Sequence, residues 1–181
     1  MNDMTVVKKY FDKIYDNLNT INYKDFYKTL KLINKLKKNN KIIFVGNGGS
    51  ASISSHCATD FNKILKKRSI TFNEPNLITC YANDFGHENW MKEALKTYGN
   101  KNDILFLISS SGQSQNIIKC AEQAKKMNIK VIGMSGFKKN NKLSKLSNIS
   151  FWVNSNSYNQ IEMTHHIWIL LMCDYISKKF N

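Results

Sequence analysis

The sequence has little arginine and little proline: Arg68 is the only arginine and Pro75 the only proline among 181 residues. Lysine supplies the rest of the basic residues, so the net charge of +14 does not bring the bidentate arginine contacts that nucleic-acid recognition favours. The lysines are spread along the chain. We therefore expect a solvated basic surface that attracts anionic substrates in general, and no nucleic-acid partner.

Cysteine and long apolar runs are scarce as well. The four cysteines are far apart and form no CxxC pair, so we expect no disulfide framework and a reducing compartment. No apolar run reaches the roughly 18 residues of a membrane span, so we expect no membrane partner. The chain begins with a charged amphipathic stretch that has no apolar h-region, so we expect no signal peptide and a cytoplasmic protein.

The length fits a single domain over residues 1–181. Apolar residues recur at helical spacing over residues 4–39 and predict two helices joined by a turn at 19–23. Short continuous apolar runs follow and predict buried strands at 41–45, 76–81, 104–108, 131–134 and 149–153. Helical segments are expected between and after them, at 50–65, 87–98, 113–127, 141–146 and 158–178. This alternation predicts an α/β fold, a doubly wound five-stranded parallel sheet flanked by helices, preceded by the helical pair.

Two polar loops follow strands of this predicted sheet. The first strand ends in Gly46-Asn47-Gly48-Gly49-Ser50, and the strand at 104–108 ends in Ser109-Ser110-Ser111-Gly112-Gln113-Ser114. Ligands bind at the carboxyl ends of parallel strands, and a helix N-terminus attracts anions. Four hydroxyl groups and free backbone N–H groups at a helix start predict a phosphate site in the second loop.

The two loops, together with Ala82-Asn83-Asp84-Phe85-Gly86, resemble motifs of the sugar isomerase (SIS) domain family, in particular its phosphoheptose isomerase branch. The resemblance covers nearly the whole chain. It implies the SIS fold and a homotetramer with sites at subunit interfaces, in which we expect residues 1–40 to pack between subunits. The substrate-binding residues that it implies, with one residue of the last helix, are Asn47, Gly48, Ser50, Asn83, Asp84, Ser109, Ser110, Ser111, Ser114 and Glu162.

His56 and Asp60 stand four residues apart, which places them on one helical face. Such a pair can bind zinc, move protons, or simply form a hydrogen-bonded surface pair. In the resembled family this helix carries a His and, four residues later, a Glu. Those residues bind zinc in the members that use it, and the Glu is a catalytic acid/base. His56 falls on the His, and Asp60 falls on the Glu with a side chain one methylene shorter.

The last helix departs from the family pattern. The family usually has a Gln at the position of Glu162 and a catalytic His eight residues later, where this chain has Leu170. Glu162 and His166 share a helical face, so His166 is expected to supply an imidazole one turn earlier, with His165 as the alternative inward histidine. If the two helices face each other, His56, Asp60, Glu162 and His166 are expected to bind one zinc ion. Asp60, Glu162 and His166 are the expected catalytic groups.

The resemblance implies an aldose–ketose isomerase that converts sedoheptulose 7-phosphate to D-glycero-D-manno-heptose 7-phosphate, for heptose and surface polysaccharide biosynthesis. Two alternatives stay open at this point. One is a non-catalytic SIS module that binds a phosphosugar as a regulator or binds the DnaA initiator. The other is an isomerase or epimerase for a different phosphosugar, with its pocket rebuilt around residues 162–170.

Overall fold

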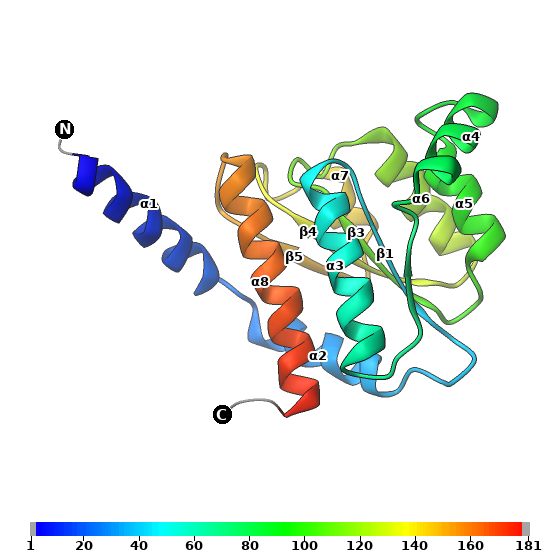
Figure 1. Ribbon diagram of the computed structural model, residues 1–181, viewed down its shortest axis with the longest axis horizontal. Helices are drawn as coiled ribbons and strands as arrows, with labels where there is room; N and C mark the ends of the chain where they lie inside the picture. The colour runs from blue at the N-terminus through cyan, green and yellow to red at the C-terminus, as the bar shows by residue number, and fades with distance from the viewer. Residues whose placement is uncertain (1–2, 179–181) are drawn as a thin grey trace.

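A computed structural model describes residues 3–178 (Figure 1). Its helices are α1 (Asp3–Leu18), α2 (Tyr23–Asn34), α3 (Gly49–Lys63), α4 (Pro75–Phe85), α5 (Trp90–Tyr98), α6 (Gln115–Lys126), α7 (Lys142–Leu146) and α8 (Tyr158–Ser177). Its strands are β1 (Ile42–Gly46), β2 (Ser69–Thr71), β3 (Ile104–Ile108), β4 (Lys130–Ser135) and β5 (Ile149–Trp152). The predicted helical pair, the turn between its helices and four of the five predicted strands are confirmed.

The strands form one parallel sheet in the order β2-β1-β3-β4-β5, which confirms the predicted fold class. From β1 the chain moves outward to β2 and then returns past β1 to β3, β4 and β5. The direction of winding therefore reverses between β1 and β3, where Gly46 lies opposite Ile108. Ligands bind at this switch point in doubly wound sheets, and both predicted loops begin there.

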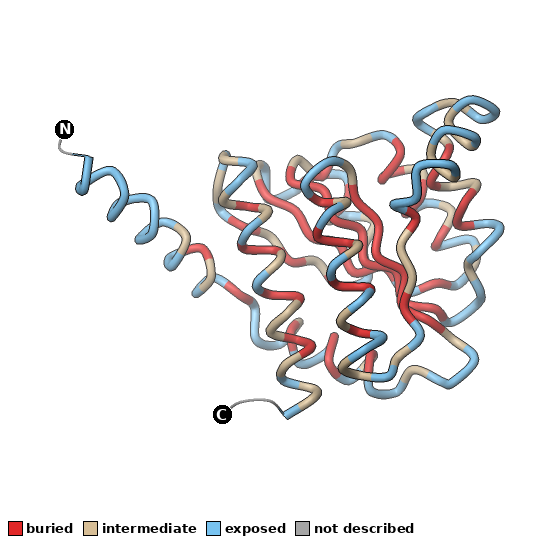
Figure 2. The backbone as a smooth tube through the Cα atoms, viewed as in Figure 1, coloured by how far each residue is buried: buried red, intermediate tan, exposed pale blue. Residues whose placement is uncertain are grey.

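Alternate residues of the central strands pack on opposite faces of the sheet, as the period of a strand requires. Phe44 and Phe106 stack with ring centroids 4.8 Å apart on the face that α2, α3 and α8 cover. Val45 and Leu107 point to the other face, which α5, α6 and α7 cover. Figure 2 shows the central strands as a continuous buried band. Because both faces are covered, every residue of β1 and β3 is buried.

The predicted strand at 76–81 is wrong, because this segment lies in helix α4. Pro75 stands in the first helical turn, where its fixed φ fits and its missing N–H costs nothing. Glu74 caps the helix, since its carboxylate accepts a hydrogen bond from the backbone N–H of Leu77 at 2.8 Å. The apolar residues Leu77, Ile78 and Tyr81 lie on one side of the helix against the core. The fifth strand is instead β2, a short edge strand.

Helix α1 extends away from the rest of the chain (Figures 1 and 2). Its large apolar side chains Val6, Val7, Tyr10, Phe11 and Tyr15 are exposed. Its C-terminal end is attached to the body of the domain, where the indole N–H of Trp168 donates to the carbonyl of Leu18 at 3.1 Å. Within residues 3–178, no helix is long and apolar enough to cross a membrane.

Candidate active site

The loop after β1 brings backbone close to two other elements. Gly46 packs so tightly on the first turn of α3 that an added Cβ would lie 2.6 Å from Ser50. Gly48 has φ +53°, in the left-handed region that favours glycine. An added Cβ at Gly49 would overlap the carboxylate of Glu162. The glycines therefore allow α8 to bring a carboxylate against the start of α3.

The loop after β3 presents hydroxyl groups at the start of α6. Ser109 and Ser114 have their hydroxyl oxygens 3.4 Å apart. The Ser110 hydroxyl is buried and makes no hydrogen bond within the described residues. Ser114 stands at the N-cap of α6, and its side chain does not cap the helix. Hydroxyls and N–H groups are thus left for an anion at the positive end of the helix.

The two loops and the start of α8 line an open cavity of about 100 Å³. Since a water molecule takes about 30 Å³ of liquid volume, the cavity has room for a group of roughly phosphate size. The side chains that line it are Asn47, Ser50, Ile108, Ser109, Ser110, Ser111, Ser114, Tyr158 and Glu162. Most of the predicted substrate-binding residues therefore meet in one place.

Glu162 is the only acidic side chain among those that line the cavity. Its partial burial raises the pKa of the carboxyl above the usual value. A carboxyl group with a raised pKa is a better proton donor near neutral pH than an ordinary glutamate. It is also less repulsive toward a phosphorylated ligand.

Asp60, His56 and His166 form a second polar group, beside the cavity and not among its lining residues. His56 Nε2 lies 3.2 Å from the Asp60 carboxylate, and His56 Nδ1 lies 2.8 Å from His166 Nε2. With both rings neutral, His56 Nε2–H donates a hydrogen bond to the Asp60 carboxylate, so His56 Nδ1 accepts a hydrogen bond from His166 Nε2–H. The lone pair of His166 Nδ1 is then the basic end of the chain of hydrogen bonds.

The structure decides which of the two neighbouring histidines faces the site. His165 is fully buried, and its Nε2 donates to the backbone carbonyl of Ser135 at 3.1 Å. Burial lowers the pKa of His165 to about 4, so the ring is neutral in the folded protein at neutral pH. His166 is half-buried against His56; burial, and secondarily the His56 charge, lowers the pKa of His166. His166 is therefore the one that joins Asp60 and His56.

The four residues predicted to hold zinc do not surround a common point. Tetrahedral zinc with Zn–N bonds of about 2.0–2.1 Å would hold two nitrogens about 3.3 Å apart. The nitrogens of His56 and His166 are instead 2.8 Å apart, within a hydrogen bond. Among residues 3–178, no group of three or more His, Cys, Asp or Glu side chains is placed to hold a metal ion. The residues as placed do not fit zinc, and zinc binding stays a prediction.

Asn83 and Asp84 do not line the cavity. They lie exposed near the end of α4, where the Asn83 amide donates to the Asp84 carboxylate at 3.0 Å. Gly48 is exposed at the rim and is also absent from the cavity lining. Leu170, at the position of the family's catalytic His, packs partly buried against the core. A substrate role for Asn83, Asp84 and Gly48 stays a prediction.

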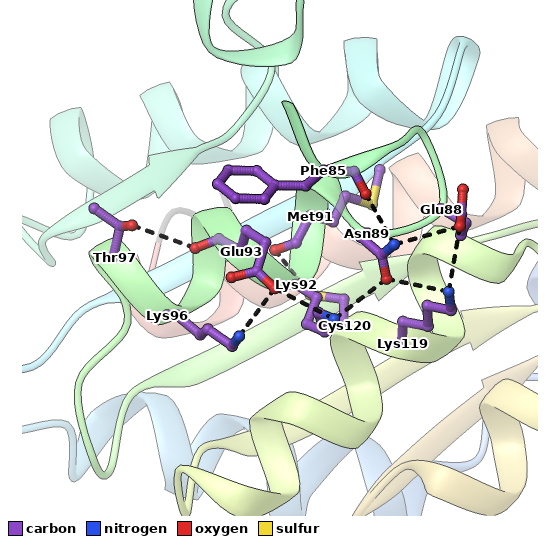
Figure 3. A network of polar contacts seen from close by, with 10 residues as sticks. All are labelled: Phe85, Glu88, Asn89, Met91, Lys92, Glu93, Lys96, Thr97, Lys119 and Cys120. Atoms are coloured by element: carbon purple, nitrogen blue, oxygen red, sulfur yellow. Dashed lines mark hydrogen bonds and ion pairs between the residues drawn. The ribbon is translucent and has the colours of Figure 1, made fainter. Parts of the chain in front are cut away.

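The connection that follows Asp84 is held to α6 by a polar network (Figure 3). The amide of Asn89 donates to the carbonyl of Phe85 at 2.9 Å, and its oxygen accepts from Lys119 at 3.1 Å. Lys119 also lies 3.6 Å from the Glu88 carboxylate. These two hydrogen bonds of Asn89 fix the end of α4 relative to α6.

Two side chains at the site were not found from the sequence. Tyr158 lines the cavity and packs its ring 5.0 Å from that of Phe137. Asn116, in the first turn of α6, forms a pair of hydrogen bonds with Asn47. The periodicity of apolar residues does not mark either residue as part of the site. An exposed tyrosine and a buried asparagine are recognised as site residues only once the positions of the loops are known.

Comparisons with known proteins agree with this architecture. The SIS domain family model matches residues 9–136. A phosphoheptose isomerase of Helicobacter pylori (strain HPAG1) is 35% identical over 154 residues, covering 82% of this chain and 80% of that protein. Among solved structures, a phosphoheptose isomerase from Neisseria gonorrhoeae matches with a TM-score of 0.88 at 22% identity, over 97% of this chain and 98% of that one. One from Francisella tularensis matches with a TM-score of 0.86 at 24% identity, over 99% and 100%.

Proposed function

Because the chain belongs to the SIS domain family, we propose that it is a phosphosugar isomerase that interconverts sedoheptulose 7-phosphate and D-glycero-D-manno-heptose 7-phosphate. One observation carries the proposal: the serine loop and a carboxyl group of raised pKa line the same cavity at the switch point of the sheet. The identity to curated phosphoheptose isomerases supports the choice of a heptose and a role in heptose biosynthesis.

The phosphate binds in the serine loop. Ser109, Ser110, Ser111 and Ser114 supply hydroxyls, and the start of α6 supplies N–H groups and the positive end of a helix. This arrangement holds a dianion without an arginine. Binding of the remote phosphate orients the reacting end of the sugar, so part of the binding energy is used to accelerate the reaction.

The sugar extends from the serine loop along α8, past Glu162 toward His166. In the ketose-to-aldose direction, His166 Nδ1 removes a proton from C1 while the Glu162 carboxyl protonates the oxygen on C2. The product is a cis-enediol. Glu162 then takes the proton from the oxygen on C1, and His166 returns its proton to C2. Asp60 orients His166 through His56, and the charge of Asp60 favours the protonated form of His166. Each such acid/base group contributes about 10²–10⁴-fold.

The non-catalytic alternative predicts phosphosugar binding without turnover. Purified protein is incubated with a panel of C5 to C7 ketose phosphates, and product formation is followed by NMR. The proposal predicts conversion of sedoheptulose 7-phosphate and weaker or no conversion of the shorter sugars. Binding of sedoheptulose 7-phosphate with no conversion of any ketose would identify a regulator instead.

The proposed enzyme is a cytoplasmic homotetramer. The exposed apolar side chains of α1 support assembly, since burying them between subunits removes a continuous apolar face from water. Four free cysteines fit a reducing compartment. We expect light scattering at micromolar concentration to give the tetramer mass, and Phe11→Lys, in the middle of the exposed face of α1, to lower it. A wild-type monomer would contradict the assembly.

A further inference from the structure

Asn116 is a buried polar side chain that the proposed reaction leaves without a role. It is 2% exposed and lies in the first turn of α6, outside the cavity lining. Its amide and that of Asn47 face each other: Asn47 Nδ2 donates to Asn116 Oδ1, and Asn116 Nδ2 donates to Asn47 Oδ1, both at 3.0 Å. The two carboxamides therefore form a closed pair that only amides can form in this way.

The orientation of the pair is fixed from the backbone. The N–H of Ile117 donates to Asn116 Oδ1 at 2.9 Å, so the oxygen of Asn116 must lie on that side. Asn47 must then turn its nitrogen toward that oxygen and its oxygen toward Asn116 Nδ2. One N–H of Asn47 stays unused by the pair. Asn47 lines the phosphate-sized cavity, so this N–H is available to a ligand there.

The pair also joins the two loops of the site. Asn47 follows β1, and Asn116 follows the serine loop after β3, so the hydrogen bonds cross the switch point of the sheet. β1 and β3 are held together up to Gly46 and Ile108 by their ladder, and the pair continues the connection beyond the strand ends. Loss of the pair would free the Asn47 side chain without breaking the sheet.

We propose that Asn116 is a positioning residue, which holds the Asn47 amide so that its remaining N–H donates to a phosphate oxygen of the substrate. The inference rests on the proposed function, because it assigns the cavity to the phosphate. Asn116 acts only through Asn47 and does not touch the substrate. Removing Asn116 therefore weakens substrate binding to the extent that Asn47 contributes to it.

The test is a double-mutant cycle on Asn116→Ala and Asn47→Ala, measured by calorimetric binding of sedoheptulose 7-phosphate and by KM and kcat. Each single variant is expected to weaken binding about fivefold, the effect of about one net hydrogen bond, with a smaller change in kcat. The double variant should bind no worse than Asn47→Ala alone. Asn148→Ala is the matched control, since the Asn148 amide oxygen accepts from the backbone of Val131 away from the site.

Three outcomes separate the possibilities. If the wild type binds sedoheptulose 7-phosphate and Asn116→Ala binds it with the same affinity, the inference is overturned and the proposed function stays intact. Additive losses in the double variant also overturn it, because Asn116 then acts independently of Asn47. A wild type that binds no phosphosugar overturns the proposed function and the inference with it. If thermal melting shows that Asn116→Ala does not fold, Asn116→Ser replaces it in the same cycle.

Discussion

Replacement of Gly49 by alanine separates the activity of the protein from its stability. Gly49 is the first residue of α3, and its φ lies outside the left-handed region, so alanine fits the backbone without strain. An added methyl group would overlap the Glu162 carboxylate. That carboxylate is the end of a flexible side chain, so it moves aside at little cost. Gly49→Ala therefore displaces Glu162 from the cavity and leaves the fold in place.

The two expected effects have opposite signs. Gly→Ala at a compatible site stabilises a protein by about 0.4–1 kcal/mol through the unfolded chain, and about 1 kcal/mol raises Tm by about 2–4 °C at this chain length. A reacting group misplaced by about 1 Å can cost about 10²-fold in rate. We therefore expect Gly49→Ala to keep or raise Tm while kcat falls by about 10²-fold.

The assay combines thermal melting with steady-state kinetics on sedoheptulose 7-phosphate. Ser52→Ala is the matched control, because Ser52 is exposed on the same helix and does not line the cavity. In a Glu162→Gln background, Gly49→Ala should have little further effect, since the group that it displaces has already lost its proton-transfer role. Wild-type kinetics in Gly49→Ala would refute the placement of Glu162 in the reaction.

Three further predictions concern the phosphate, pH and metal. Ser111→Ala should raise KM for the phosphosugar several-fold relative to Ser52→Ala, and unchanged affinity would remove Ser111 from the phosphate site. Burial lowers the pKa of His165 to about 4 from an ordinary 6.5, so between these two pH values His165 is protonated in the unfolded chain but not in the folded protein. The free energy of unfolding should therefore fall as the pH drops from about 6.5 toward 4. Urea titrations would contradict this if His165→Gln folds stably and its free energy of unfolding depends on pH as steeply as that of the wild type. The zinc prediction requires bound metal in protein purified without chelator and its loss in His56→Ala; metal-free wild type with EDTA-indifferent activity would contradict it.

Most of the fold could be predicted because the central strands are buried on both faces. Continuous apolar runs such as Ile42–Val45 and Ile104–Ile108 are typical of strands that helices cover on both sides. The error at 76–81 has a physical cause. Residues 76–81 contain four apolar residues, Leu77, Ile78, Cys80 and Tyr81, and so short a pattern fits a strand or one side of a helix equally well. The N-terminal cap by Glu74 and the proline at the first turn favour the helix. The true strand β2, with three residues, is too short to give a period.

The site was predictable where one loop carries its chemistry, and less so where separate elements meet. The serine loop is recognisable in the sequence because four serines follow a predicted strand and precede a predicted helix. The choice between His165 and His166 needed the rotation of α8, which a one-residue shift changes by about 100°. The pair formed by Asn47 and Asn116 connects residues 69 positions apart in the chain, and nothing local to either residue predicts it.

The most direct test of the account is NMR of sedoheptulose 7-phosphate incubated with the purified protein in D₂O. Proton transfer through a cis-enediol predicts an aldose 7-phosphate with solvent deuterium at C2, because the acid/base groups lie next to an open cavity and exchange with water. Glu162→Gln and Ser111→Ala should slow its appearance. Unchanged ketose in the presence of a wild type that binds it would contradict the claim that this protein is an isomerase.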